Sequence, residues 1–279
     1  MSVTPDALPV VEFTNKPPLF PDIGEAWRYR WMTVALIRRN LMGRYTQTIF
    51  GPAWFVLQPI MMTGVLTLVM GAILGAPSDG IPYIVFAASG TIVWTTFNRS
   101  LSETTISLVS MGPIFSKVYF PRILVPVAAL MTSATEFLPV YALLVLLVWG
   151  YGLFSGWLLL LFPAFVLLTL LVSFGLGLWL TVFDSYFRDV RLMLPFVLQF
   201  VFYFSPIIYG STAIPARWRF LFQLNPLTDL LDGIRWSLIA GAPMPTKFEM
   251  VWVTCLGVGF ALSGLFVFAR FERIIVDKI

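Results

Sequence analysis

The sequence contains no histidine and a single cysteine among its 279 residues. Without histidine, the chain cannot form zinc sites of the H-E-x-x-H type, nor Ser/His/Asp or Cys/His nucleophile arrangements. The lone Cys255 cannot form an intrachain disulfide. The dipeptide Gly-Lys is also absent, so the phosphate-binding loop G-x-x-x-x-G-K-[ST] is excluded. Any nucleotide hydrolysis would therefore need another subunit.

Charged residues are scarce as well. They make up 11% of the chain, against about 25% in soluble domains. Hydrophobic residues reach 58% and the mean hydropathy is +0.87. Because a helix needs about 20 apolar residues to cross a bilayer, we expect an all-α integral membrane protein with one transmembrane domain over residues 50–270. Its six spans are expected at about residues 50–75, 81–109, 123–149, 157–183, 191–211 and 248–270.

The Lys and Arg residues predict the orientation of these spans, since an excess of them marks the cytoplasmic side. Most of the 18 fall before the first span, after the last span, or in the connections near residues 117 and 190, whereas residues 75–80 and 150–156 contain none. We therefore expect both termini in the cytoplasm, with residues 1–22 as a proline-containing leader and residues 271–279 as a tail. The leader lacks the pattern of a secretory signal peptide, so we expect it to be retained. The net charge of +4 then reflects topology and does not call for nucleic-acid binding.

Residues 23–46 have the pattern of a basic amphipathic helix with aromatic residues on its apolar side. Such a helix lies in the membrane interface, where cations meet anionic headgroups. The alternative is a soluble surface helix that packs on the protein itself. The candidate interface residues are Trp27, Arg28, Trp31, Arg38, Arg39, Arg44 and Tyr45.

The long connection over residues 211–247 predicts two short external helices, at residues 216–224 and 228–240. They are separated at Asn225-Pro226, because the residue before a proline is pushed out of the α region. These helices are expected to be re-entrant. Since backbone at membrane depth needs protein or a water-filled cavity around it, a re-entrant hairpin would indicate a conduit nearby.

Three ionisable residues fall within the expected spans. Arg99 and Glu103 are four residues apart and can pair on one helical face. Glu136 has no such neighbour. Charges inside a membrane are functional candidates by default, yet all three can also be solvated or structural groups. For Glu136 the alternatives are a proton-coupling carboxylate and a hydrogen-bonded structural group.

Aromatic residues gather at the start of the first span and at the end of the fifth. They can anchor the chain at the membrane interface. They can also form a sugar path, since flat apolar rings contact sugar C–H faces and phenols donate hydrogen bonds. The candidate channel-lining residues are Trp54, Phe55, Phe202, Tyr203, Phe204 and Tyr209. In the last span, Gly257 and Ala261 form a small-xxx-small pair suited to packing within the chain.

A short basic and aromatic segment, Phe-Ser-Lys-Val-Tyr-Phe-Pro-Arg, covers residues 115–122 between the second and third spans. The charge pattern places it in the cytoplasm. Because the chain shows no energy-converting chemistry of its own, this segment predicts the place where an external motor acts.

Several motifs resemble one known family. They are Arg-Tyr-Thr-Gln-Thr-Ile-Phe-Gly at residues 44–51 followed by Trp54 and Pro59, Phe-Ala-Ala-Ser-Gly at 86–90, Lys-Val-Tyr-Phe-Pro-Arg at 117–122, Tyr-Phe-Arg-Asp-Val at 186–190, Ser-Pro-Ile-Ile-Tyr at 205–209, and Asn-Pro at 225–226. Together they are similar to the membrane subunits of ABC-2 type polysaccharide exporters, from about residue 25 to residue 278. The departures are mild: Tyr-Phe-Arg-Asp stands where Tyr-Arg-Asp is common, and Phe50 where Leu is usual.

The resemblance implies a non-enzymatic permease subunit of the bacterial inner membrane. It implies a homodimer in contact with membrane lipid and with two copies of an ABC ATPase, which carries ATP and Mg, so that this chain holds no cofactor or metal. The cargo would be a glycan such as O antigen on a polyprenyl diphosphate lipid. The coupling helix that docks on the ATPase would comprise Ser116, Lys117, Val118, Tyr119, Phe120, Pro121 and Arg122.

Three other functions remain open at this point. One is an ABC-2 permease for teichoic acid or another lipid-linked substrate. Another is a proton-coupled secondary transporter that uses Glu136. The last is a membrane enzyme acting on polyprenyl lipids, which the missing histidines and the scarcity of clustered carboxylates disfavour.

Overall fold

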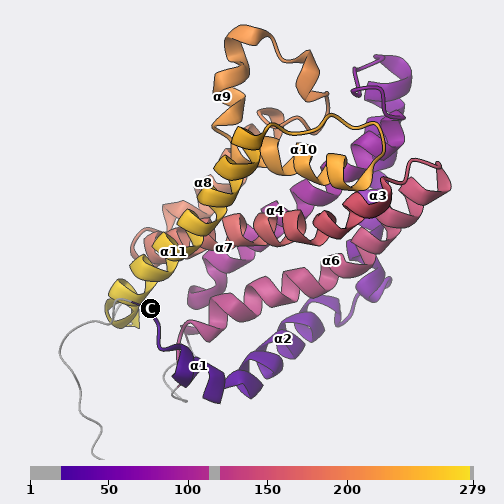
Figure 1. Cartoon of the computed structure of the whole chain (residues 1–279). Helices are drawn as coiled ribbons and strands as arrows, with labels where there is room; N and C mark the ends of the chain where they lie inside the picture. The colour runs from indigo at the N-terminus through magenta and orange to yellow at the C-terminus, as the bar shows by residue number, and fades with distance from the viewer. Residues whose placement is uncertain (1–19, 113–119, 277–279) are drawn as a thin grey trace, which may run out of the picture.

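The computed structural model describes residues 20–112 and 120–276, which form helices joined by short connections (Figure 1). The α-helices are α1 (Ile23–Arg28), α2 (Arg30–Tyr45), α3 (Trp54–Leu66), α4 (Tyr83–Ser110), α6 (Leu124–Gly150), α7 (Phe162–Tyr186), α8 (Asp189–Tyr203), α9 (Arg219–Gln223), α10 (Pro226–Leu238) and α11 (Lys247–Val276). Short 3-10 helices cover Gly51–Ala53, Gly156–Leu161, Ser211–Ala213 and Ala216–Trp218, and a π-helical turn extends α3 over Thr67–Ile73.

Within the described residues, four helical segments are long and apolar enough to cross a membrane: Gly51–Ile73, Leu124–Gly150, Gly156–Tyr186 and Lys247–Glu272. They match the first, third, fourth and sixth expected spans. The second corresponds to α4, which carries Arg99, Glu103 and many hydroxyl side chains. The fifth corresponds to α8, which ends at Tyr203 and not near residue 211. Ser205 stands directly before Pro206, and a residue before proline is disfavoured in the α region, which favours an end of the helix near this point.

Helix α7 packs closely along α11. A Cβ atom on Gly175 of α7 would lie 2.2 Å from the carbonyl carbon of Phe260, and one on Gly264 would lie 2.5 Å from the carbonyl oxygen of Gly175. Glycine therefore lets the two backbones touch. Gly257 also faces α7, since its Cβ would lie 3.3 Å from Leu168, and Ala261 is buried. The small-xxx-small pair of the last span, Gly257 and Ala261, is thus used for packing within the chain.

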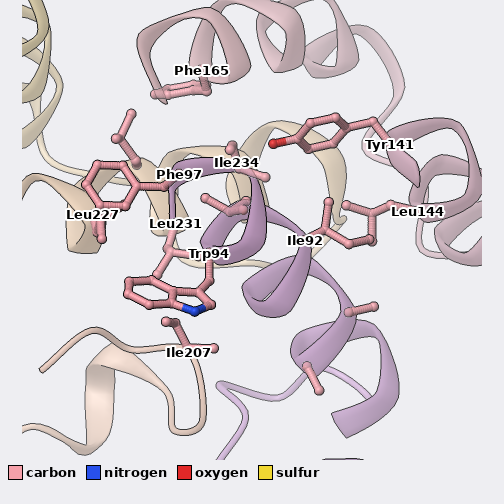
Figure 2. Packing of buried hydrophobic residues seen from close by; sticks show 14 of the residues in the cluster. Ile92, Trp94, Phe97, Tyr141, Leu144, Phe165, Ile207, Leu227, Leu231 and Ile234 are labelled. Carbon is pink, nitrogen blue, oxygen red and sulfur yellow. The ribbon is translucent and has the colours of Figure 1, made fainter. Parts of the chain in front are cut away.

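The main core forms where α4, α7 and α10 meet. Trp94 and Phe97 of α4 pack with Leu231 and Ile234 of α10, and Phe165 of α7 covers them (Figure 2). Two short helices, α9 and α10, lie in the connection where the sequence predicts them, with bounds that differ by up to three residues from those expected. Asn225 caps α10, since its side chain accepts a hydrogen bond from the Leu227 N–H.

Helix α10 also buries a cation, Arg235. Its guanidinium donates to the carbonyl of Pro206 at 2.8 Å and to Ser89 Oγ at 3.2 Å. The guanidinium carbon lies 3.7 Å from the ring centre of Phe86. Because buried charge must be compensated, these contacts fix α10 against α4 and the segment after α8.

The predicted helix over residues 23–46 consists of two pieces, α1 and α2, separated at Tyr29. Asp22 caps the first piece by accepting from the Gly24 and Glu25 N–H groups. Trp27 and Trp31 are exposed, and Arg30 lies over both rings. Helix α2 runs along α6 at the end of the molecule where α11 finishes, and α9 lies at the opposite end (Figure 1).

Candidate functional site

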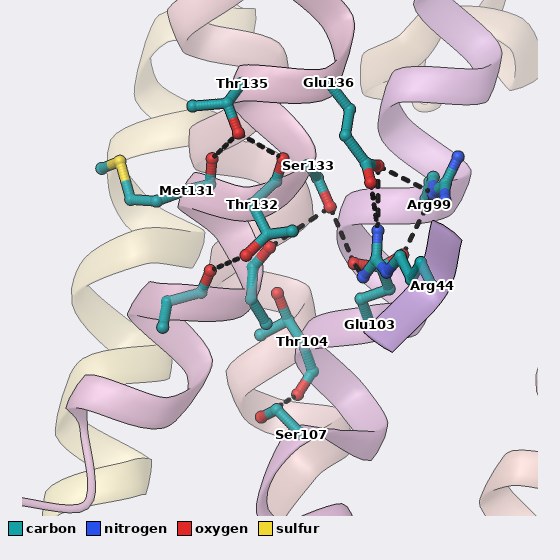
Figure 3. Close-up of polar contacts among 12 residues, drawn as sticks. Arg44, Arg99, Glu103, Thr104, Ser107, Met131, Thr132, Ser133, Thr135 and Glu136 are labelled. Atoms are coloured by element: carbon teal, nitrogen blue, oxygen red, sulfur yellow. Dashed lines mark hydrogen bonds and ion pairs between the residues drawn. The ribbon is translucent and has the colours of Figure 1, made fainter. Parts of the chain in front are cut away.

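Side chains from three helices meet in one ionic cluster, formed by Arg44 and Tyr45 of α2, Arg99 and Glu103 of α4, and Glu136 of α6 (Figure 3). The Arg44 guanidinium donates to both oxygens of Glu136, at 2.9 and 2.8 Å, and also to Glu103. Arg99 Nε donates to Glu103 Oε1 at 3.1 Å and lies 3.3 Å from Glu136 Oε2. The cluster therefore joins α2 to both α4 and α6.

The charges in the ionic cluster balance, with two guanidinium groups facing two carboxylates. The Arg99–Glu103 contact confirms the pair predicted from their spacing. Glu136 is 1% exposed, and such a buried carboxylate is stable only when it is paired and hydrogen-bonded. The Tyr45 hydroxyl supplies another donor to Glu136, at 2.7 Å. Burial, and then the bond to Glu136, raise the pKa of Tyr45 to about 12, so its phenol remains a donor at neutral pH.

The structure corrects the view of Glu136 as an isolated acid. Its partners come from α2, which the sequence pattern places at the membrane interface, and from α4. Arg44 and Tyr45 accordingly point inward and not only toward headgroups. One sequence signal could have found the contact: a carboxylate without a cation on its own helix needs one from elsewhere, and Arg44 directly precedes the first span.

A hollow of about 910 Å³ lies between α3 and α4 beside the ionic cluster. Arg99 and Glu103 belong to both. The wall combines the aromatic rings of Trp54, Phe55 and Trp94 with the polar side chains of Gln58, Asn98 and Ser102. Several of its side chains are exposed, so the hollow lies at the surface of the single chain. We call it the α3–α4 hollow.

The six predicted channel-lining residues do not gather in one place. Trp54 and Phe55 line the α3–α4 hollow. Phe202 is buried and packs edge-on against Trp94, with ring centres 5.3 Å apart. Phe202 therefore contacts a residue that lines the α3–α4 hollow but does not line it itself. The other three, Tyr203, Phe204 and Tyr209, lie beyond Phe202 at the end of α8, where the Tyr209 hydroxyl donates to the Tyr203 carbonyl at 2.8 Å.

The predicted coupling segment is only partly described. Ser116, Lys117, Val118 and Tyr119 lie outside the described residues. Phe120 is 3% exposed and belongs to a second core cluster that also contains Leu36 of α2. Pro121 is also buried. Arg122 donates a hydrogen bond through its backbone N–H to Glu272 Oε1 of α11, at 3.2 Å.

Two of the buried charged residues that the structure describes hold neighbouring helices together and were not singled out by the sequence pattern. One is Arg235, described above. The other is Asp184 of α7, which accepts two hydrogen bonds from Arg191 of α8, both at 2.9 Å. Both pairings fix the geometry of neighbouring helices. Neither residue borders the α3–α4 hollow.

Comparison with known proteins gives a consistent match. The family described as "ABC-2 type transporter" matches residues 33–239, a range that includes the whole ionic cluster. An O-antigen export system permease protein, RfbA of Klebsiella pneumoniae, is 23% identical over 86% of this chain and 92% of its own length. RfbA of Myxococcus xanthus is 25% identical over 76% of this chain and 81% of that protein. The polysialic acid transport protein KpsM of Escherichia coli is 25% identical over 74% of this chain and 81% of that protein.

Proposed function

This chain belongs to the ABC-2 type transporter family, and we propose that it is the membrane subunit of an ATP-driven exporter of lipid-linked polysaccharide. The cargo would be a glycan of the O-antigen type, moved from the cytoplasm across the bacterial inner membrane. The relatives named as O-antigen permeases support this proposal over most of the chain. The observation that carries it is the α3–α4 hollow.

The wall of the α3–α4 hollow suits a sliding glycan. Rings such as Trp54 and Trp94 can contact the apolar faces of sugars, while Gln58 and Asn98 can exchange hydrogen bonds with hydroxyl groups. A moving polymer requires many weak contacts that it can leave. Because the hollow lies at the surface of one chain, we infer that a second copy covers it and that the homodimer encloses the conduit.

We further infer that α4 and α8 complete a six-span domain. Helix α4 has 28 residues and is therefore about 42 Å long, enough to cross a hydrocarbon core of about 30 Å. Its charged side chains, Arg99 and Glu103, would face the conduit and the ionic cluster. They would then avoid the free-energy cost of placing a charge in hydrocarbon, which is the main obstacle to inserting α4 in the membrane. In this arrangement α1, α2 and both termini lie in the cytoplasm, and α9 and α10 lie toward the outer side.

The ionic cluster gives a physical route for force. A partner ATPase would bind near residues 116–122 and move the cytoplasmic end of the bundle. Arg44 then transmits a shift of α2 to Glu103, which borders the α3–α4 hollow. Packed and hydrogen-bonded helices carry such displacements because they have discrete arrangements.

A cavity of about 340 Å³ beside the ionic cluster, between α2, α4 and α6, suits the diphosphate of the lipid carrier. Arg39 and Asn40 line it and can donate hydrogen bonds, whereas the hydroxyls of Ser107 and Ser110, also in the lining, already donate to the carbonyls of Thr104 and Ser107. Phosphate oxygens accept strong bonds from such groups, especially from arginine. The carrier would thus bind at the cytoplasmic end, next to the residues that couple α2 to the hollow.

Deleting the gene and locating the lipid-linked glycan tests this function. We expect the glycan to accumulate on the cytoplasmic side and to disappear from the cell surface, with recovery on expression of the intact chain. Loss of glycan synthesis itself would indicate an enzyme and contradict the proposal. Transport that survives loss of every partner ATPase but stops when the proton gradient collapses would indicate a secondary transporter instead.

A further inference from the structure

A second polar cavity lies near α9, at the end of the molecule opposite α1 (Figure 1). Its volume is about 240 Å³, and it is lined by the segment after α8, helices α9 and α10, residues 243–246 and the start of α11. Its acidic side chains are Asp229 and Asp232 of α10 and Glu249 of α11. We call it the acidic cavity. It shares no lining residue with the α3–α4 hollow.

Two buried polar atoms of the acidic cavity have no hydrogen-bond partner among the described residues. Asp229 is 4% exposed and Thr228 is 5% exposed, and the atoms concerned are Asp229 Oδ2 and Thr228 Oγ1. Glu249 differs, because it accepts from Gln223 Nε2 at 3.2 Å and from the Thr246 N–H at 2.7 Å. Since buried polar groups in proteins are nearly always bonded, the two atoms indicate a place for a ligand that bears hydroxyl groups or other hydrogen-bonding atoms.

The charge state of Asp229 narrows the chemistry of that ligand. Burial, and then the nearby Glu249 and Asp232, raise the pKa of Asp229 to about 8. At neutral pH its carboxyl group is therefore mostly protonated and can both donate and accept. A metal ion would need an ionised carboxylate, and the described residues contain no group of three or more metal-binding side chains placed to hold one. A neutral polyol fits better, because each hydroxyl also donates and accepts.

One wall of the acidic cavity is aromatic. Phe222 lines it, and its ring centre lies 6.0 Å from Phe204 and 6.4 Å from Tyr209. An aromatic ring and a set of acceptors in the lining of one cavity suit a sugar ring, which has apolar C–H faces and an edge of hydroxyl groups. Phe222 also connects the cavity to the aromatic residues at the end of α8.

We propose that the acidic cavity binds one sugar unit of the exported glycan on the outer side, through Thr228, Asp229 and Phe222. The inference rests on the proposed function, since it takes the cargo to be a glycan. The cavity is slightly smaller than the ligand pockets of about 300 Å³ and above that are common in proteins, which favours a single ring over a chain segment. A weak subsite of this kind holds the leading end of the polymer as it emerges.

Saturation-transfer NMR on the full-length chain in lipid nanodiscs tests the proposal, with a panel of free monosaccharides and methyl glycosides as probes. We expect at least one pyranose to bind. Thr228→Val keeps the shape of the side chain and should weaken binding about five- to tenfold, since it removes one buried hydrogen bond. Thr254→Val makes the same change at an exposed position of α11 and should leave binding unchanged.

Asp229→Leu provides a second variant and should abolish the signal. Asp229→Asn keeps a donor and an acceptor and should retain most of it at pH 7. The proposal is overturned if no sugar binds to the wild-type chain, or if Thr228→Val binds like wild type. It is also overturned if calcium alone raises the melting temperature through Asp229 while sugars do not, because the site is then a cation site.

The gene-deletion experiment separates this inference from the proposed function. If the intact chain restores surface glycan but no monosaccharide binds to it, export stands and the sugar subsite does not. If the deletion leaves the location of the glycan unchanged, the proposed function itself is wrong.

Discussion

The guanidinium of Arg44, at the end of α2, donates two hydrogen bonds to the buried carboxylate of Glu136 on α6. The residues are 92 positions apart in the chain. The contact fixes the end of α2 to α6. Because Glu136 is 1% exposed, the pairing is also a condition for its burial.

Arg44→Gln should therefore destabilise the protein and impair export. The change leaves Glu136 buried with less positive charge beside it, and loss of one partner of a buried pair costs about 3 kcal/mol. Arg99 remains close to Glu136 and limits the loss. Thermal unfolding of the purified chain measures the first effect, and the amount of glycan at the surface measures the second.

Arg38→Gln is the matched control, since Arg38 is an exposed arginine on the same helix. It should leave both readings near wild type. The double variant Arg44→Gln/Glu136→Gln should regain stability relative to Arg44→Gln alone, because it removes the uncompensated charge. Equal melting temperatures for Arg44→Gln and Arg38→Gln would show that the pair does not hold α2.

The crossing of α7 and α11 should tolerate no side chain at Gly175. A Cβ there would lie 2.2 Å from the backbone of Phe260, so Gly175→Ala must push the helices apart. We expect a large loss of folded protein, measured as the monodisperse fraction in size-exclusion chromatography. Gly259 lies on α11, the helix that Gly175 contacts, but a Cβ there would have nothing within 4 Å, so Gly259→Ala should be neutral or slightly stabilising. Similar yields for the two variants would contradict the close approach.

Much of the helix arrangement follows from the sequence because it depends on local patterns. The charge-poor run at residues 123–149 predicts α6 almost to the residue, and Asn225-Pro226 predicts the break between α9 and α10. In each case the cause lies within a few residues of the effect. Hydrophobic length sets the span, and the proline limits the residue before it.

The candidate site was less predictable because its contacts join distant segments. The spacing of Arg99 and Glu103 reveals one pair within a helix, but no periodicity connects Arg44 to Glu136. Phe120 shows the same limit, since the sequence places it only in the predicted coupling segment, and the fold is needed to show that it is buried in the cluster that contains Leu36. Arg235 lies in an external connection by sequence, and only the fold places it over Phe86.

Asp229 should make the stability of the chain depend on pH. Its pKa is raised from 3.8 to about 8 on folding, mainly by burial. The folded state therefore binds the proton more tightly than the unfolded state, and stability falls as pH rises from about 4 to 8. Asp229→Asn cannot ionise and removes this penalty. We expect its melting temperature to exceed that of wild type at pH 9 and to match it near pH 4, apart from the ionisation of other groups.

Thermal melting of both proteins across this pH range checks the effect. Asp189→Asn, at an exposed position of α8, is the control and should follow the wild-type curve. A constant difference between wild type and Asp229→Asn at every pH would mean that the carboxyl group does not titrate differently on folding.

The α3–α4 hollow should be filled with water if it forms half of a conduit. The only native cysteine is Cys255, so Cys255→Ser gives a background without thiols. A single cysteine introduced as Asn98→Cys lies in the wall of the hollow. A charged thiol reagent needs water both to arrive and to meet an ionised thiolate, and we expect it to react at this position in membranes. Leu68→Cys is the comparison, since Leu68 is 62% exposed and does not line the hollow, so that lipid would surround it. Its thiol should react at least tenfold more slowly, because a charged reagent is strongly disfavoured in hydrocarbon.

Addition of the partner ATPase with ATP should change the labelling rate at Asn98→Cys and not at Leu68→Cys, since the hollow is connected to α2 through Glu103 and Arg44. Equal and slow labelling at both positions in every condition would show that the hollow is a lipid-facing groove, and a conduit would then have to lie elsewhere in the bundle.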